Sequence, residues 1–155
     1  MISPDSPEGR QLGQLYALDE SIRGRFLQQA IVTDGLIEDI LATYFCPEEE
    51  RRRMLRWLVF GLAEVTFSDK ISALAKLLQR AYPEVNAAHP KLEHQLTTIR
   101  KFRNRMAHAM VDTSDEFLRH GYTDRVQLTY EEGGQRKQMG TAHPDAMGRA
   151  DSLTG

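Results

Sequence analysis

The chain has 155 residues, of which 41% are hydrophobic and 27% are charged, and its formal net charge at pH 7 is −2. These values are typical of one folded globular domain, and they exclude a global electrostatic attraction to nucleic acid or to an anionic membrane. Any basic binding site must therefore be a local concentration of Lys and Arg. The single cysteine, Cys46, cannot form an intramolecular disulfide, which favours a reducing, cytoplasmic location.

The N-terminal residues show neither the basic region nor the apolar run of a signal peptide, so no targeting segment is expected. An amphipathic pattern then runs from about residue 9 to residue 44. Its apolar residues recur at steps typical of a helix: Leu12, Leu15, Leu18, Ile22, Phe26, Ala30, Ile37, Ile40, Leu41 and Tyr44. We expect one long helix, or two nearly collinear ones with a break at Thr33-Asp34-Gly35, ending at Cys46-Pro47.

Pro47 is expected to open a second helix, because three glutamates follow it and favour the positive end of a helix dipole. Three arginines come next, and the spacing predicts the ion pairs Glu48–Arg52 and Glu49–Arg53. A solvated salt-bridge face is therefore a better interpretation of this basic run than a nucleic-acid site. The buried side of the helix is expected to contain Met54, Leu55, Leu58, Val59 and Leu62.

Two further helices are predicted. Ser68 is expected to cap a helix from Asp69 to Ala81, and Val85 to His89 is expected to be a connector. The last helix spans about residues 90–111. The apolar stripes of the two helices consist of Ile71, Leu74, Leu77 and Leu78, and of Leu92, Leu96, Ile99, Phe102, Met106 and Met110.

The pattern changes after residue 115. Arg125–Tyr130 alternates polar and apolar residues, Glu132-Gly133-Gly134 is a turn signal, and Gln135–Met139 can return as a second strand. Val126, Leu128 and Tyr130 are expected to face inward. The predicted fold is mainly α: an antiparallel bundle of four to five helices over about residues 9–112, a small C-terminal β-hairpin over about 123–140 and a loose tail over 141–155, in a single domain of residues 1–155.

The last helix carries Arg103-Asn104-Arg105-Met106-Ala107-His108. Asn104 and His108 are four residues apart and share a helix face, whereas Arg103 and His108 lie about 140° apart around the helix and roughly 7.5 Å apart along its axis. One copy therefore makes no compact pair, but a second copy across a twofold axis would bring two Arg and two His into one cleft. The ordinary alternative is a surface His beside an Arg that lies along the apolar stripe.

This segment resembles the motif of the higher eukaryotes and prokaryotes nucleotide-binding (HEPN) superfamily, in which Arg-Asn is followed by three residues and His. Phe67–Ile71, with Leu74 and Leu77, is similar to the third helix of several branches. The resemblance covers about residues 10–112. It implies an α-helical bundle that dimerises along the motif helix, and in many members a metal-independent endoribonuclease. Arg103 and His108 match the two defining positions, and Asn104 matches the polar position between them.

The chemistry implied by the resemblance suits these residue types. RNA carries its own nucleophile, the 2′-OH, so cleavage needs a proton acceptor and a cation beside the phosphate. His108 would act as general acid or base, and Arg103 would stabilise charge on the phosphate oxygens. Asn104 would orient His108 or donate to the phosphate, and the product would be a 2′,3′-cyclic phosphate.

Neighbouring cations favour an anionic polymer as the partner. Arg100, Lys101 and Arg105 lie within two turns of Arg103, and Lys101 and Arg105 are expected to point into solvent, where they could hold RNA phosphates. A solvated basic face is the alternative for Lys101 and Arg105.

The remaining acidic residues and histidines are weaker candidates for a functional site. Asp34 and Glu38 lie one helical turn apart and could hold a metal or orient His108, although two acidic residues on an exposed face are the commoner explanation. His89, His94, His120 and His143 have no partners at metal-ligand spacing, so neither a metal nor another cofactor is expected.

Three functions follow. The leading one is a toxin-like or defence-related HEPN endoribonuclease that cleaves RNA and forms a homodimer through residues 90–111. We expect an antitoxin or nucleotidyltransferase as a further partner, and no membrane partner. The second is a non-catalytic HEPN-fold dimer that serves as a binding or adaptor protein. The third is a helical bundle unrelated to the superfamily.

Overall fold

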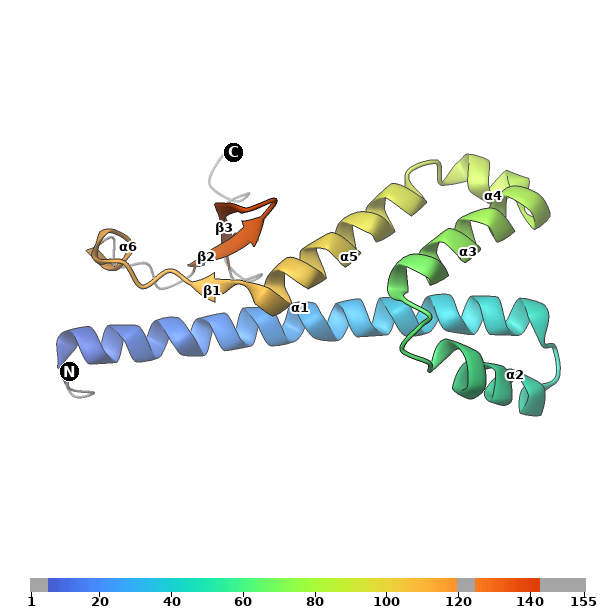
Figure 1. Cartoon of the computed structure of the whole chain (residues 1–155), viewed down its shortest axis with the longest axis horizontal. Coiled ribbons are helices and arrows are strands. Elements are labelled where there is room, and N and C mark those ends of the chain that lie inside the picture. Colours follow the sequence, from blue (N-terminus) through green and yellow to red (C-terminus); the bar gives the residue numbers. More distant parts are fainter. Residues whose placement is uncertain (1–5, 120–124, 143–155) are drawn as a thin grey trace, which may run out of the picture. The chain divides into compact units, whose positions relative to one another are not determined.

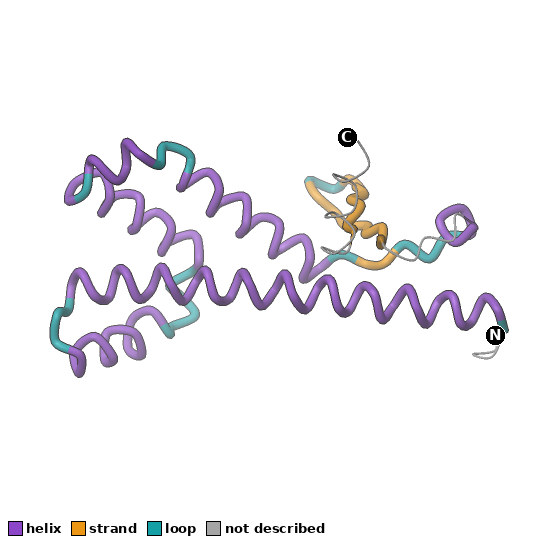
Figure 2. The backbone as a smooth tube through the Cα atoms, turned by 180° about the vertical axis from the view of Figure 1, so that it is seen from behind, coloured by secondary structure: helices purple, strands orange, loops and turns teal. Residues whose placement is uncertain are grey.

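The structure is a computed structural model, and it describes residues 6–119 and 125–142. It is mainly helical, with a small antiparallel sheet in its C-terminal part, which confirms the predicted fold class (Figures 1 and 2). The elements are α1 (Pro7–Phe45), α2 (Glu49–Leu55), a π-helical turn η1 (Arg56–Phe60), α3 (Phe67–Ala81), α4 (Pro83–Ala88), α5 (Leu92–His108), β1 (Met110–Val111), α6 (Asp115–Arg119), β2 (Arg125–Glu132) and β3 (Gln135–Ala142). Among the described helices, none is both long and apolar enough to cross a membrane.

The first helix is continuous. α1 runs through Thr33-Asp34-Gly35 without a break and ends at Phe45, just before the predicted end at Cys46-Pro47 (Figure 1). Gly35 lies at a normal helical position, and a Cβ added there would meet no atom within 4 Å. Of the two predicted alternatives, the single unbroken helix is therefore confirmed.

Contacts divide the chain into two compact units. One unit consists of Met1–Leu27 with Arg105–Gly155, and the other of Gln28–Asn104. Both α1 and α5 pass from one unit into the other. We call the unit that contains Arg105–Gly155 the sheet unit and the unit of Gln28–Asn104 the helical unit.

The core of the helical unit is formed by α1, α3 and α5. Its buried side chains are Ile37, Leu41, Ile71, Leu74, Leu77 and Leu96. The predicted stripe of α3 is thus confirmed, but its predicted cap is wrong. Thr66, not Ser68, caps α3, because its hydroxyl accepts the backbone N–H of Asp69 and the Asp69 carboxylate accepts the backbone N–H of Thr66. The Thr66 hydroxyl also donates to the Asp69 carboxylate at 2.6 Å, and this bond, followed by the one from the Thr66 backbone N–H, lowers the pKa of Asp69.

The predicted burial of α2 is wrong. Met54, Leu58, Val59 and Leu62 are exposed, although the apolar period predicts a buried side. Periodicity shows that a helix has an apolar face, but it does not show that the same chain covers that face. The predicted ion pairs of Arg52 and Arg53 are also not those of the structure. Arg51 binds Glu48 at 3.0 Å, and Arg52 donates to the carbonyl of Pro47.

In the sheet unit, the strand order is β1-β2-β3, with both pairs antiparallel. The predicted hairpin is confirmed: Glu132 pairs with Gln135, and Gly133 and Gly134 both adopt positive φ, as a two-residue turn of this type requires. Val126 and Leu128 are buried as predicted, whereas Tyr130 is half-buried. The sequence analysis missed β1 and α6, which have two and five residues. It also assigned α4 as a connector.

Candidate nucleic-acid-cleaving residues on α5

The three residues of the HEPN-like motif lie on α5, a helix of seventeen residues. Arg103, Asn104 and His108 are all exposed, and His108 is the last residue of the helix. Their placement on an accessible helix surface is compatible with contact to a polymeric substrate.

Arg103 and Asn104 contact each other in the helical unit. Nη1 of Arg103 donates to Oδ1 of Asn104 at 3.1 Å. From the sequence, Asn104 was expected to orient His108 or to donate to a phosphate. In the structure, its side-chain carbonyl oxygen accepts a hydrogen bond from Arg103. The guanidinium fork of Arg103 has further N–H donors, and its planar geometry is suited to a phosphate.

His108 belongs to the sheet unit, because the boundary between the units falls after Asn104. The structure therefore does not bring Arg103 and His108 together within either unit. This agrees with the helical spacing, which separates the two side chains around a single helix.

The neighbouring cations differ in their surroundings. Lys101 is exposed and Arg100 is half-buried. Arg105, expected to point into solvent, instead donates to Glu132 at 2.8 Å, and its guanidinium lies 5.2 Å from the ring centre of Tyr130. The hydrogen bond that Arg105 donates to Glu132 raises the pKa of Arg105. The side chain of Arg105 remains 33% exposed, but a carboxylate and an aromatic ring from β2 bind it.

Glu132 is the acceptor for two cations of the sheet unit. It accepts hydrogen bonds from Lys137, at 2.7 Å, and from Arg105. These two bonds lower the pKa of Glu132 from 4.5 to about 2. Glu132 thus connects α5, β2 and β3 by charge-assisted hydrogen bonds.

The C-terminal end of α5 is held by Arg23, a residue that the sequence analysis missed. Its Nη1 donates to the carbonyl oxygens of Met106 and Ala109, which flank His108, and Asp19 accepts two hydrogen bonds at 3.0 Å from Nη2. Carbonyls at a helix end lack partners within the helix, so a cation here satisfies them. The sequence pattern that could have indicated this contact is the i,i+4 spacing of Asp19 and Arg23 beside the buried Ile22.

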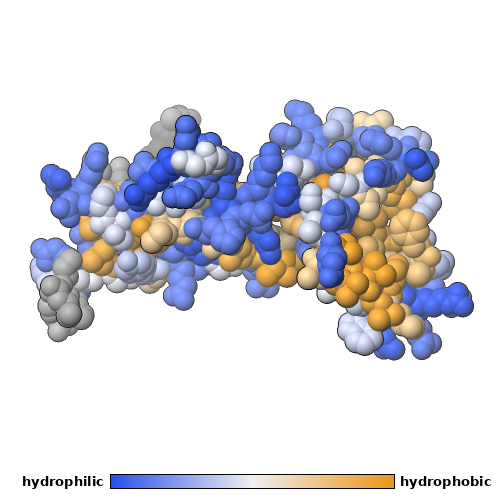
Figure 3. All heavy atoms as spheres, viewed as in Figure 1, coloured by the Kyte–Doolittle hydropathy of each residue, from blue (hydrophilic) through white to orange (hydrophobic). Residues whose placement is uncertain are grey.

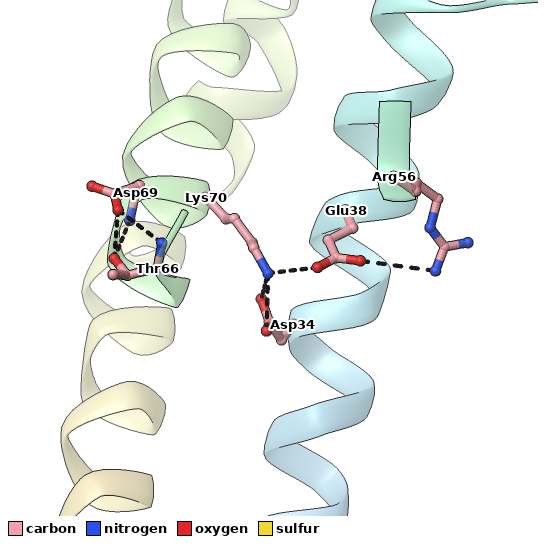
Figure 4. Close-up of polar contacts among 6 residues, drawn as sticks. All are labelled: Asp34, Glu38, Arg56, Thr66, Asp69 and Lys70. Atoms are coloured by element: carbon pink, nitrogen blue, oxygen red, sulfur yellow. Dashed lines mark hydrogen bonds and ion pairs between the residues drawn. The ribbon is translucent and has the colours of Figure 1, made fainter. Parts of the chain in front are cut away.

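Asp34 and Glu38 have a structural partner in the helical unit. Both bind Nζ of Lys70, at 3.1 and 2.5 Å, and Lys70 is only 5% exposed (Figure 4). Arg56 extends the cluster to Glu38 and, at 2.6 Å, to Asp39. The interpretation of two acids on an exposed face is wrong, because Lys70 of α3 lies against them, and their oxygens bind this ammonium group.

Burial of the Lys70 ammonium group disfavours its charge, but the hydrogen bonds that it donates to Glu38 and Asp34 outweigh this effect. The pKa of Lys70 is therefore raised above its ordinary value of 10.5. A lysine held charged in this way is a structural cation and not a nucleophile. Within the described ranges 6–119 and 125–142, no group of three or more His, Cys, Asp or Glu side chains could hold a metal ion.

A cavity of about 250 Å³ lies between α3, α4 and α5 of the helical unit. It is lined by residues that include Gln79, Asn86, His89 and Glu93, and by none of the motif residues. His89 thus faces a cavity and not a metal partner. His120 and His143 lie outside the described residues.

Comparison with family models, with curated proteins and with solved structures found no match for this chain. The interpretation of the site therefore depends on the motif residues and on the contacts described above.

Proposed function

We propose that this chain is a HEPN-type endoribonuclease that cleaves RNA without a metal ion, with Arg103 and His108 as its catalytic residues. The observation that carries the proposal is the exposure of both side chains on the last long helix of a mainly helical fold. A side chain that must reach a phosphodiester within a polymer has to lie on such an accessible surface.

The proposed reaction is attack of the 2′-OH on the adjacent phosphorus, with departure of the 5′-oxygen. His108 takes the proton from the 2′-OH or gives one to the leaving oxygen, and histidine is suited to both near neutral pH. Arg103 neutralises the charge that develops on the phosphate oxygens, while Asn104 holds one arm of its guanidinium group at 3.1 Å. The products are a 2′,3′-cyclic phosphate and a free 5′-OH.

Arg100 and Lys101 would hold the RNA backbone beside the site. Both lie on α5 in the same unit as Arg103, so they form a local cationic surface on a chain whose net charge is −2. Arg105 is a weaker candidate for this role, because it already binds Glu132.

A complete site would need two copies of the chain. The helical spacing separates Arg103 from His108, so we propose that a homodimer through residues 90–111 combines the Arg103 of one copy with the His108 of the other. In this proposal the protein is a toxin-like or defence effector in the cytoplasm, controlled by an antitoxin or nucleotidyltransferase partner.

The test is incubation of purified protein with RNA in EDTA. We expect cleavage by the wild type and at least a hundredfold slower cleavage by His108→Ala, since general acid–base catalysis contributes about 10²–10⁴-fold. His94→Ala is a matched control, because His94 is also an exposed histidine of α5. Equal rates for His108→Ala and His94→Ala would exclude the proposed role of His108.

The alternative is a non-catalytic adaptor, and the position of Arg105 favours it. Arg105 connects the motif helix to β2, so the motif segment also has a structural role in the sheet unit. An adaptor predicts no RNA cleavage by the wild type, together with loss of folding stability on substitution of Arg105. The RNA assay separates the two functions.

A further inference from the structure

The helical unit exposes an unusual number of large apolar side chains. We call this set the apolar face: Val32, Leu36, Ile40 and Tyr44 of α1, Met54 of α2, Trp57, Leu58 and Val59 of η1, and Leu62. Figure 3 shows apolar side chains gathered over the C-terminal half of α1 and over η1. Their exposed fractions range from 39% for Val59 to 75% for Trp57.

The α1 part of the apolar face forms a regular ridge. Val32, Leu36, Ile40 and Tyr44 are spaced by four residues, which aligns them along one side of a helix over about 18 Å. An open groove of about 560 Å³ adjoins the ridge, and Ile40, Tyr44 and Tyr82 are among its lining residues. Side chains spaced by four residues form an i±4n ridge, and such ridges pack between the i±4n ridges of a partner helix.

The exposed apolar area is of the order that an interface needs. The two aromatic side chains, Tyr44 and Trp57, each have about 150–250 Å² to bury, and 44% and 75% of their surface is exposed. The seven aliphatic residues, which are 39–57% exposed, add to this area. The apolar face is therefore comparable with the largest apolar patches on monomers, roughly 300–600 Å², and with the roughly 800 Å² that each partner contributes to a standard interface.

Two arginines beside the apolar face are paired within the chain. Arg56 binds Asp39 at 2.6 Å, and Arg51 binds Glu48 at 3.0 Å. The charges of these two arginines are therefore balanced where two identical faces would meet. Such balance favours a twofold interface, since each surface meets its own copy.

We propose that a second copy of this chain docks on the apolar face in an isologous dimer, with Trp57 in the interface. Tryptophan is a frequent hot-spot residue, and an exposure of 75% leaves most of Trp57 unburied in one copy. The proposal does not depend on the nuclease function. It is also separate from a contact through α5, where the described residues include no exposed large apolar side chain between Leu92 and His108.

Sedimentation velocity of the full chain at micromolar concentration tests this proposal. We expect the wild type to form an oligomer and Trp57→Glu to have half its mass. Leu36→Glu, on the α1 ridge, is expected to have the same effect. Tyr16→Glu is the matched control, because Tyr16 is 54% exposed but lies in the part of α1 that belongs to the sheet unit. Circular dichroism verifies that each variant is folded.

Fluorescence gives a second readout, because Trp57 is the only tryptophan of the chain. Dilution of the wild type is expected to shift the emission to longer wavelength as the copies separate. The proposal is overturned if the wild type is monomeric at about 100 μM, if folded Trp57→Glu and Leu36→Glu retain the mass of the wild type, or if Tyr16→Glu alone halves it.

Discussion

The guanidinium group of Arg23 donates a hydrogen bond to the carbonyl oxygen of Ala109 at 3.1 Å, and so joins α1 to the residue that directly follows His108. Arg23 also donates to the carbonyl of Met106, and its own charge is balanced by Asp19. The end of the motif helix is therefore fixed by contacts within the sheet unit. In the proposed nuclease, this contact holds the backbone on both sides of the general acid–base residue.

Replacing Arg23 should weaken the fold. Arg23→Ala leaves the buried Asp19 carboxylate without its cation and removes the hydrogen bonds to the two carbonyls at the end of α5, so we expect a loss of about 1.5–3 kcal/mol in the free energy of unfolding. Denaturant unfolding measures this loss. Arg25→Ala, at an exposed position of α1, should change the same quantity by less than about 0.5 kcal/mol. Similar effects of the two substitutions would show that the Arg23 contacts contribute little.

Lys70 should be a second stabilising residue. Removing one partner of a buried ion pair costs about 3–5 kcal/mol, and the partial exposure of Asp34 and Glu38 reduces this for Lys70→Met to about 2–4 kcal/mol. Lys76→Met, an exposed lysine of α3, is the control and should cost less than about 0.5 kcal/mol. A free energy of unfolding equal to that of the wild type for Lys70→Met would contradict the role of the cluster.

The stabilisation by Lys70 should also depend on pH. Because the pKa of Lys70 is raised in the folded state, its contribution is fully present below the ordinary value of 10.5 and is lost as the pH rises through the higher folded value. The difference in unfolding free energy between the wild type and Lys70→Met should therefore be constant near neutral pH and shrink above about pH 10.5. A difference that shrinks already at pH 8 would contradict the raised pKa.

Glu132 should titrate at an unusually low pH. Hydrogen bonds from Lys137 and Arg105 favour its charged form and lower its pKa from 4.5 to about 2. Its stabilising effect is present above pH 4.5 and is lost as the pH falls through about 2. NMR of the side-chain carboxyl carbon measures this pKa, and Lys137→Ala should move it back toward 4.5. A wild-type value near 4.5 would show that these hydrogen bonds are not maintained in solution.

The cap of α3 can be tested directly. Thr66→Ala removes the hydroxyl that accepts the N–H of Asp69, and such a loss costs about 0.5–2 kcal/mol of unfolding free energy. Ser68→Ala, two residues later, is the control and should have a smaller effect. Thermal or denaturant unfolding of the two variants gives the comparison, and a larger loss for Ser68→Ala would reverse the assignment.

The sequence predicted the long elements because their signals are local. The three- and four-residue period of α1 and α3 and the paired glycines after Glu132 specify helices and a tight turn by themselves. The short elements β1, α4 and α6 have too few residues for a period, and β1 forms only through pairing with β2.

The contacts of the candidate site were harder to predict. The motif indicated Arg103 and His108, but the partners of Arg105 and the contact from Arg23 come from residues far away in the sequence. Lys70 was missed for the same reason, since its acidic partners lie on another helix. The exposure of Met54 and Leu58 differs from the prediction, because an apolar period does not show whether the same chain covers that helix face.

The most direct test of the proposed nuclease is analysis of the RNA ends that it produces. A single RNA is incubated with the wild type in EDTA, and the fragments are identified by mass spectrometry. The proposal predicts 2′,3′-cyclic phosphate and 5′-OH ends from the wild type, and at least a hundredfold fewer of them from His108→Ala. It also predicts no cleavage of DNA of the same sequence, which lacks the 2′-OH. Intact RNA with the wild type, or the same fragments in equal amount from His108→Ala, would contradict it.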